Sequence, residues 1–135
     1  DAPERAEPPT LRGDERILLV EDEPEVRKAI GSLLATAGYS VQAAVDGQDA
    51  LEQLEAMQTL PDLVLTDLIM PRMKGHEMAE HIRGRWPALR VLFMSGYSDD
   101  VVQDRVGLGD AELLRKPPTL HELTAAVRRA LDRQS

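Results

Sequence analysis

Short apolar runs alternate with helical patterns along most of this 135-residue chain, and this alternation restricts the fold more than any other feature. Runs at 17–20, 63–66 and 90–94, with a weaker one at 40–44, have the length of strands buried on both faces of a parallel sheet. A fifth strand is expected at 112–114. The sequence therefore predicts an α/β fold.

Helical spacing of apolar residues fills the stretches between these strands. The first helix is expected to begin at Pro24 and to end before Gly38, since proline suits a first helical turn and glycine a helix end. The pattern predicts further helices at 50–57 and 75–85, a short or irregular one from 99 to about 105, and a last one capped by Thr119.

This order predicts a doubly wound, five-stranded parallel sheet with helices on both faces. Ligands of such sheets bind outside the carboxyl ends of the strands. The proline-bearing stretch 1–15 is predicted to be a linker or tail, and 16–135 the folded domain.

Composition excludes several function classes. The chain has no cysteine, so disulfides, zinc–thiolate sites and iron–sulfur clusters are excluded. A net charge of −8 argues against non-specific nucleic-acid binding, and no apolar run approaches the length of about 20 residues that spans a membrane. A cytoplasmic domain without membrane contact is expected.

The predicted strand ends hold most of the chemistry. Glu21 and Asp22 follow the first strand, Asp67 the third, Ser95 the fourth and Lys116 the fifth. Two carboxylates at about 4 Å repel by roughly 4 kcal/mol at an effective dielectric of 20, so a shared edge needs proton uptake or a cation. Hard oxygen donors without histidine or cysteine suit Mg²⁺, with Mn²⁺ as an alternative.

A hydroxyl and an ammonium beside such a cation could hold the oxygens of a phosphoryl group, and an aspartate there could become an aspartyl-phosphate. Each residue also has an ordinary structural interpretation. Asp67 could cap a helix, Ser95 could form a turn, and Glu21–Glu23 could be an exposed loop. Their combination at one edge favours the functional interpretation.

The chain resembles a response regulator receiver domain, the CheY-like module of two-component signalling. The resemblance covers about 16–133, and five motifs support it in order: Ile17–Pro24, Asp62–Asp67, Met70–Gly75, Val91–Tyr97 and Leu114–Pro117. The family implies a flavodoxin-like three-layer sandwich with strand order 2-1-3-4-5 and a cis peptide bond between Lys116 and Pro117.

By this resemblance, Asp67 accepts phosphate from a phosphohistidine of a histidine kinase or histidine phosphotransfer protein. Asp22, Asp67 and the backbone carbonyl of Ile69 would bind Mg²⁺, with Glu21 acting directly or through water. Ser95 and Lys116 would contact the phosphoryl group. The domain would catalyse its own phosphorylation and dephosphorylation without being a conventional enzyme, as a monomer or weak dimer.

Some positions depart from the family pattern. Glu21 stands where aspartate is usual, Leu113 where many members have an aromatic switch residue, Lys74 where an acid is common, and Pro118 where phenylalanine is common. The stretch Met94–Asp100 is similar to receivers fused to hybrid histidine kinases, and the preceding linker fits that position.

Two other functions remain open from the sequence. A phosphatase of the haloacid dehalogenase type would need a second acid at the position of Ile69. A phosphorylation-independent pseudo-receiver would be expected to lack Asp67, Lys116 or an acid, and all are present. The sequence does not identify the cognate kinase, the output partner or the phosphoryl lifetime.

Overall fold

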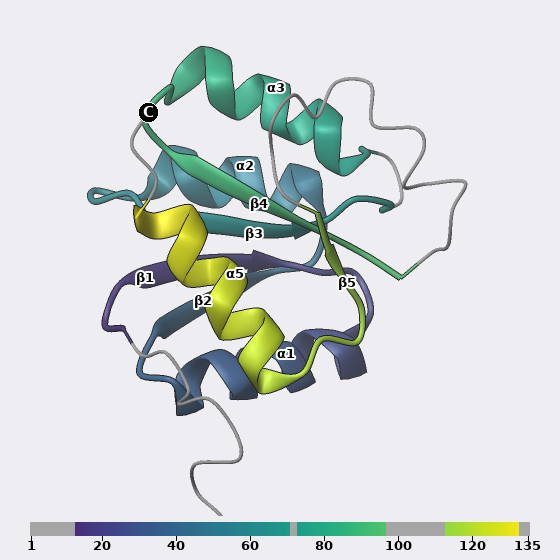
Figure 1. Cartoon of the computed structure of the whole chain (residues 1–135). Coiled ribbons are helices and arrows are strands. Elements are labelled where there is room, and N and C mark those ends of the chain that lie inside the picture. The colour runs from purple at the N-terminus through teal and green to yellow at the C-terminus, as the bar shows by residue number, and fades with distance from the viewer. Residues whose placement is uncertain (1–12, 71–72, 97–112, 133–135) are drawn as a thin grey trace, which may run out of the picture.

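A computed structural model of the chain describes residues 13–70, 73–96 and 113–132. The helix expected from 99 to about 105 and the start of the fifth strand at Glu112 lie outside these residues. Within them, strands and helices alternate as the sequence predicts (Figure 1).

Five parallel strands form one sheet in the order β2-β1-β3-β4-β5, as the resemblance implied. Their bounds are β1 Arg16–Val20, β2 Ser40–Ala44, β3 Leu63–Asp67, β4 Arg90–Ser95 and β5 Leu113–Arg115. All five residues of β3 are buried, because the central strand is covered on both faces. β2 is the edge strand and is mostly exposed or half-buried.

Helices cover both faces of the sheet (Figure 1). α1 (Pro24–Thr36) and α5 (Leu120–Asp132) pack on one face, where Leu34 and Val127 join a buried cluster with Ile17, Leu19 and Leu65. α2 (Gly47–Ala56) and α3 (Gly75–Arg85) pack on the other face, as their buried side chains show. The buried residues of this second cluster are Leu18, Val20, Ala44, Ala50, Leu54, Val64, Met70, Met78 and Ile82.

The alternation of side chains along β1 explains this division. Ile17 and Leu19 point to the α1–α5 face, whereas Leu18 and Val20 point to the α2–α3 face. Every one of these four side chains is at most 1% exposed. A strand with two buried faces has no polar alternation, which is why the sequence shows a continuous apolar run.

Several predicted boundaries shift by one to three residues: β1 begins at Arg16, α2 begins at Gly47, β3 ends at Asp67 and β4 ends at Ser95. Two further corrections have a visible cause. The second helix ends at Ala56, and Met57 has an extended backbone, although its apolar spacing placed it in the helix. The fifth strand extends through Arg115, one residue beyond the prediction, because Arg115 pairs with Ser95 of β4.

The turn after α1 depends on glycine. Gly38 has a φ of 104°, a conformation that residues with a Cβ rarely adopt. A Cβ at Gly38 would also lie 2.3 Å from the carbonyl oxygen of Gly13. The prediction that Gly38 closes the first helix is confirmed.

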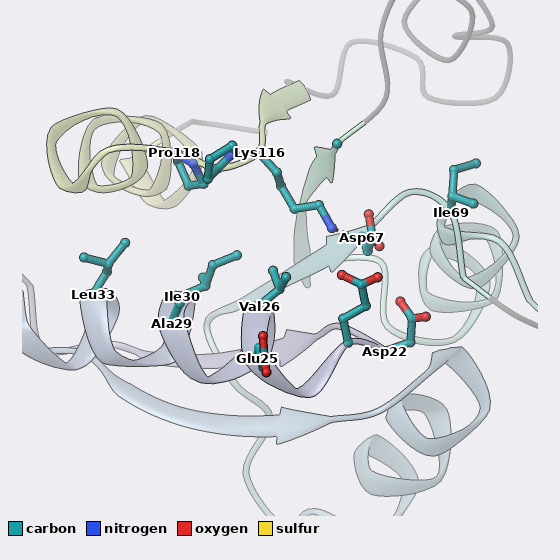
Figure 2. Close-up of a pocket in the computed structure, with 13 residues that line it drawn as sticks. Asp22, Glu25, Val26, Ala29, Ile30, Leu33, Asp67, Ile69, Lys116 and Pro118 are labelled. Atoms are coloured by element: carbon teal, nitrogen blue, oxygen red, sulfur yellow. Dashed lines mark ion pairs between the residues drawn. The ribbon is translucent and has the colours of Figure 1, made fainter.

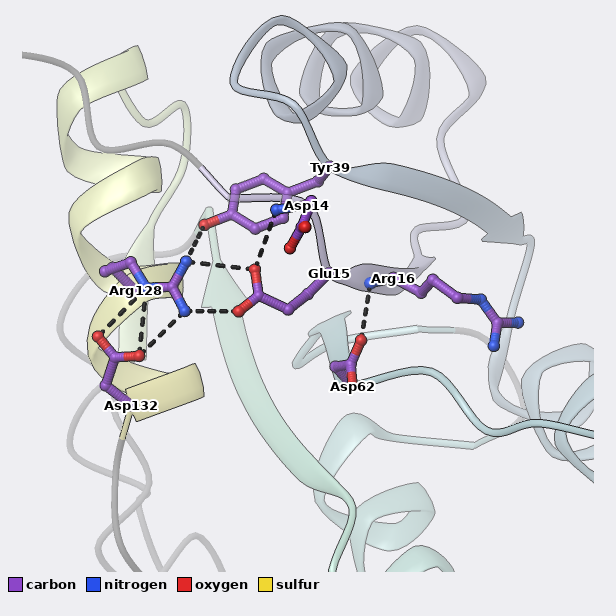
Figure 3. Close-up of polar contacts among 7 residues, drawn as sticks. All are labelled: Asp14, Glu15, Arg16, Tyr39, Asp62, Arg128 and Asp132. Carbon is purple, nitrogen blue, oxygen red and sulfur yellow. Dashed lines mark hydrogen bonds and ion pairs between the residues drawn. The ribbon is translucent and has the colours of Figure 1, made fainter.

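The residues just before β1 bond to the rest of the domain at the edge of the sheet opposite the carboxyl strand ends (Figure 3). Both amine groups of Arg128 in α5 donate to the carboxylate of Glu15, at 2.6 and 3.2 Å, and one of them also donates to the hydroxyl of Tyr39 at 3.3 Å. The amide of Gly13 donates to the carbonyl of Ala37 at 3.1 Å. At least two residues of the predicted linker, Gly13 and Glu15, therefore bond to the folded unit.

Candidate functional site

The carboxyl ends of β1, β3, β4 and β5 bring the predicted site residues to one edge of the sheet. Glu21 follows β1, Asp67 ends β3, Ser95 ends β4, and Lys116 follows β5. Figure 2 shows Asp22, Asp67 and Lys116 pointing toward one another across this edge. The parallel register places them together, because all four strands run in the same direction.

Three carboxylates form the centre of the site. Glu21, Asp22 and Asp67 each offer an oxygen, and these oxygens all lie within 4.8 Å of one another. Glu21 is fully buried, Asp67 is 5% exposed, and Asp22 is half-buried. Among residues 13–70, 73–96 and 113–132, these three side chains form the group whose spacing could hold a metal ion. Three carboxylates without histidine or cysteine form a donor set that fits Mg²⁺ or Mn²⁺.

Lys116 supplies the positive charge. Its Nζ donates to Oε1 of Glu21 at 2.9 Å and lies 3.2 Å from Oδ2 of Asp67. Its side chain is only 13% exposed, so water weakens these ion pairs little. The backbone also fixes the residue: its amide donates to the carbonyl of Ser95 at 2.9 Å, and the bond to Pro117 is cis, as expected.

The pKa of Asp67 shows how these charges balance. Burial raises this pKa, and the carboxylates of Glu21 and Asp22 raise it further, whereas the ammonium of Lys116 lowers it. The result is a pKa of about 6, compared with an ordinary value of 3.8. Asp67 is therefore mostly ionised at neutral pH, but at a cost that a bound cation would reduce.

The pKa of Lys116 changes in the direction that keeps its charge. Burial lowers this pKa, but the hydrogen bond to Glu21 and the charges of Asp67 and Glu21 outweigh burial and raise it overall. Lys116 therefore remains an ammonium at physiological pH.

Gly75 allows the third helix to approach Asp67. Its amide donates to the carbonyl of Leu68 at 2.8 Å, at the start of α3. A Cβ at this position would lie 2.5 Å from the carbonyl oxygen of Asp67 and 3.0 Å from Cα of Leu68. The sequence showed Gly75 only as part of a motif, and its role becomes visible only in this contact.

Arg27 also belongs to this region, although it stands outside the polar residues that directly follow the strands. It lies in α1, and its Nη1 donates to the backbone carbonyl of Glu21 at 2.7 Å. The only sequence signal is its position one helical turn after Glu23, whose carbonyl accepts from the Arg27 amide at 2.9 Å. Such a spacing returns a side chain toward the residues before the helix.

The remaining predicted residues also lie at this edge. Ser95 is 1% exposed at the end of β4, and Ile69 lines the same cavity as Asp22, Asp67 and Lys116. Leu113, at the position of the expected switch residue, is half-buried against a small cluster that contains Leu68, Ala79 and Phe93.

A groove of about 660 Å³ extends from the carboxylates along α1 (Figure 2). Its apolar lining comes from α1 and from the segment between β5 and α5. The apolar lining residues are Val26, Ala29, Ile30, Leu33, Pro117 and Pro118. Asp22, Glu23 and Glu25 add negative charge near the site. The groove could therefore accept an apolar surface with positive charges beside it.

None of the helices in the described part of the chain is long and apolar enough to cross a membrane.

Comparisons with known proteins identify the family of this chain. The model of the response regulator receiver domain family matches residues 17–128. The sensor kinase CckA of Brucella abortus is 35% identical over 126 residues, which are 92% of this chain but only 13% of that kinase. The chain thus spans a small part of this relative's length.

Two solved structures show the same fold. The receiver domain of the hybrid histidine kinase CckA is 34% identical, with a TM-score of 0.69 over 87% of this chain and 99% of that one. The response regulator TrrA of Thermotoga maritima, solved in complex with Mg²⁺–BeF, is 30% identical, with a TM-score of 0.77 and the same two coverages. By its family match, its relatives and its strand order, the chain belongs to the response regulator receiver domains of two-component signalling.

Proposed function

We propose that this domain takes a phosphoryl group onto Asp67 from a phosphohistidine, in a reaction that depends on Mg²⁺. The observation that supports this most is the position of the Asp67 carboxylate, 3.2 Å from the ammonium of Lys116 and beside two further carboxylates. A structural aspartate would not need two neighbours of its own charge in a buried site.

The reaction uses Asp67 as the nucleophile. One carboxylate oxygen forms a bond to phosphorus while the bond between phosphorus and the histidine nitrogen breaks, and the electron pair of that bond stays on the imidazole. The pKa of about 6 leaves Asp67 mainly ionised near pH 7, which a nucleophile requires.

Asp22 and Asp67 would hold the cation, with the Ile69 backbone carbonyl as a further ligand and Glu21 acting directly or through water. When bound, Mg²⁺ would offset the charge on the transferring phosphoryl oxygens. The likeness to TrrA, which was solved with Mg²⁺–BeF, supports this assignment. Mn²⁺ has similar oxygen preferences and is the expected substitute.

Lys116 and Ser95 would hold the phosphoryl oxygens that the cation leaves free. The Lys116 ammonium already lies between Glu21 and Asp67, so it can interact with a group attached to Asp67 without a large movement. Phosphorylation would then shift the population of surface conformations near β4, which a partner protein reads.

The donor would be a histidine kinase or a histidine phosphotransfer protein that packs along α1. The groove beside the carboxylates supports this, since its apolar lining and acidic residues suit a helix with apolar residues and neighbouring basic ones. The likeness to a region of the sensor kinase CckA supports an origin in a hybrid kinase. We propose that the domain acts in the cytoplasm as a monomer or weak dimer.

Intact-mass measurement after incubation with acetyl phosphate tests the proposal. Wild type should gain one phosphoryl group with Mg²⁺ and none with a chelator, and Asp67→Asn should gain none. Asp62→Asn is the matched control, because Asp62 directly precedes β3 at its opposite end and accepts from the Arg16 amide. It should be phosphorylated as wild type is.

Two results would contradict the proposed phosphorylation of Asp67. If folded wild type gains no phosphoryl group from acetyl phosphate or phosphoramidate, the proposal is wrong, and a phosphorylation-independent pseudo-receiver becomes the better account. An adduct that persists in Asp67→Asn would place the chemistry on another residue.

A further inference from the structure

The loop between β1 and α1 is held by Arg27. Glu21 is fully buried, so its backbone carbonyl needs a hydrogen-bond donor within the protein. Nη1 of Arg27 is that donor, at 2.7 Å. A charged donor at this distance forms one of the stronger hydrogen bonds in proteins.

The other groups of Glu21 are also bonded. Its amide donates to the carbonyl of Ala44 in β2 at 3.1 Å, and its Oε1 accepts from Lys116 at 2.9 Å. Its Oε2 accepts from the amide of Glu23 at 3.2 Å. Arg27 therefore completes a set of contacts that fixes the whole residue between the sheet and α1.

Asp22 depends most on this contact. The carbonyl that Arg27 holds belongs to the peptide bond joining Glu21 to Asp22, and this bond is planar. Fixing the carbonyl therefore fixes the direction in which the chain enters Asp22. Asp22 is also the most exposed of the three carboxylates and would otherwise be the freest.

The start of α1 offers little other support. Its cap residue, Glu23, makes no side-chain capping hydrogen bond, and Pro24 has no amide hydrogen to donate. The guanidinium of Arg27 instead connects the first turn of the helix to the end of β1.

The positive charge of Arg27, considered alone, would weaken the binding of a cation. The guanidinium is hydrogen-bonded to the backbone of Glu21, one of the three carboxylate residues, and a positive charge there repels a divalent cation, so its removal should strengthen cation binding. A positioning role predicts that its removal weakens binding. The two explanations therefore differ in sign.

We infer that Arg27 is a positioning residue for the cation site: its hydrogen bond to the Glu21 carbonyl holds Asp22 where it can share a divalent cation with Asp67. This inference rests on the Mg²⁺ binding in the proposed function.

Calorimetric titration of the full chain with MgCl₂ tests the inference. Arg27→Gln should bind Mg²⁺ about tenfold more weakly than wild type, the usual effect of losing a residue that orients a metal ligand. Arg27→Lys, which keeps a charged donor with fewer hydrogen bonds, should lose about threefold at most. Lys28→Gln removes the same charge from the next, exposed residue of α1 and should bind Mg²⁺ about as tightly as wild type or slightly more tightly.

A second comparison tests the route through Asp22. In an Asp22→Asn background, adding Arg27→Gln should weaken binding by less than about twofold, since the residue to be positioned has already lost its charge. A further tenfold loss there would contradict the inference, because Arg27 would then act independently of Asp22.

The outcomes separate the two proposals. If Arg27→Gln binds Mg²⁺ as tightly as wild type or more tightly, Arg27 is only a nearby charge and the inference is wrong. If wild type itself binds no Mg²⁺, the Mg²⁺ dependence of the proposed function is wrong, and the inference about Arg27 is wrong as well. If Arg27→Gln does not fold, as judged by circular dichroism, Arg27→Lys decides alone: binding tighter than wild type would overturn the inference.

Discussion

Replacing Asp67 by asparagine should stabilise the domain at neutral pH in the absence of metal. The folded structure raises the pKa of Asp67 to about 6 through burial and the neighbouring carboxylates. Ionised Asp67 is therefore less favourable in the folded protein than in the unfolded chain. Asparagine has almost the same shape and no charge, and Glu21 remains as the partner of Lys116 at 2.9 Å.

The size of the effect follows from the pKa shift. The difference between about 6 and the ordinary 3.8 is worth about 3 kcal/mol, at 1.36 kcal/mol for each pKa unit. Screening by solvent lowers this energy only slightly, because Asp67 is only 5% exposed. A raised carboxylate pKa means that the stability contribution is complete below about 3.8 and is lost as the pH rises through about 6.

Urea unfolding in a chelator measures this difference. At pH 7.5 the free energy of unfolding of Asp67→Asn should exceed that of wild type by about 3 kcal/mol, and at pH 4 the two should be close. Added Mg²⁺ should stabilise wild type and narrow the gap at pH 7.5. An equal or lower stability of the variant at pH 7.5 would refute the electrostatic reasoning, because Asp67 would then not carry the cost assigned to it.

Three further predictions concern the groove, the third helix and the residues before β1. Ala29→Glu should slow phosphotransfer from an autophosphorylated histidine kinase at least tenfold without changing phosphorylation by acetyl phosphate, because Ala29 lines the groove; the exposed Ala35→Glu on the same helix should change neither rate. Gly75→Ala should lower the free energy of unfolding by about 1–3 kcal/mol and slow phosphorylation, since its Cβ would meet a backbone oxygen at 2.5 Å; an unchanged urea midpoint would contradict this. Glu15→Gln should lower the free energy of unfolding by about 1 kcal/mol at pH 7, because the hydrogen bond from Arg128 holds the pKa of Glu15 below 4.5. This stabilising contribution should be present above pH 4.5 and lost as the pH falls through the lowered pKa, so an unchanged difference down to pH 3 would contradict the prediction.

The sheet was predictable because its inner strands β1, β3 and β4 are largely buried on both faces. A strand such as β3, with five buried residues, leaves an uninterrupted apolar run that few other structures produce. The site residues were predictable for a related reason: polar residues that directly follow such runs must lie at one edge of a parallel sheet. Glu21, Asp67 and Lys116 were therefore expected together before any distance was known.

Other features depend on contacts that the sequence does not display. The bond from Arg27 to the Glu21 carbonyl and the approach of Gly75 to Asp67 each join a side chain or a missing side chain to backbone. A contact to a backbone group does not require a particular residue type at the contacted position, so the sequence carries no sign of it. The pair of Glu15 and Arg128 is separated by 113 residues, so it too becomes visible only in the fold.

Helix ends were the least predictable elements. Met57 has the spacing of an inward helical residue and packs against the core, but it does so from an extended backbone after the helix has ended. The apolar spacing shows only which side chains face the core, and a residue just past the end of a helix can face the core as well as one inside it.

Mapping the phosphoryl group after transfer from an autophosphorylated histidine kinase, in the presence of Mg²⁺, tests most directly whether Asp67 is the phosphoacceptor. Borohydride reduction converts an aspartyl-phosphate to homoserine, which peptide mass spectrometry locates. Phosphotransfer to Asp67 predicts homoserine at residue 67, dependent on Mg²⁺ and on the phosphorylated donor. Phosphate retained on a serine or histidine, or homoserine at another aspartate, would contradict it.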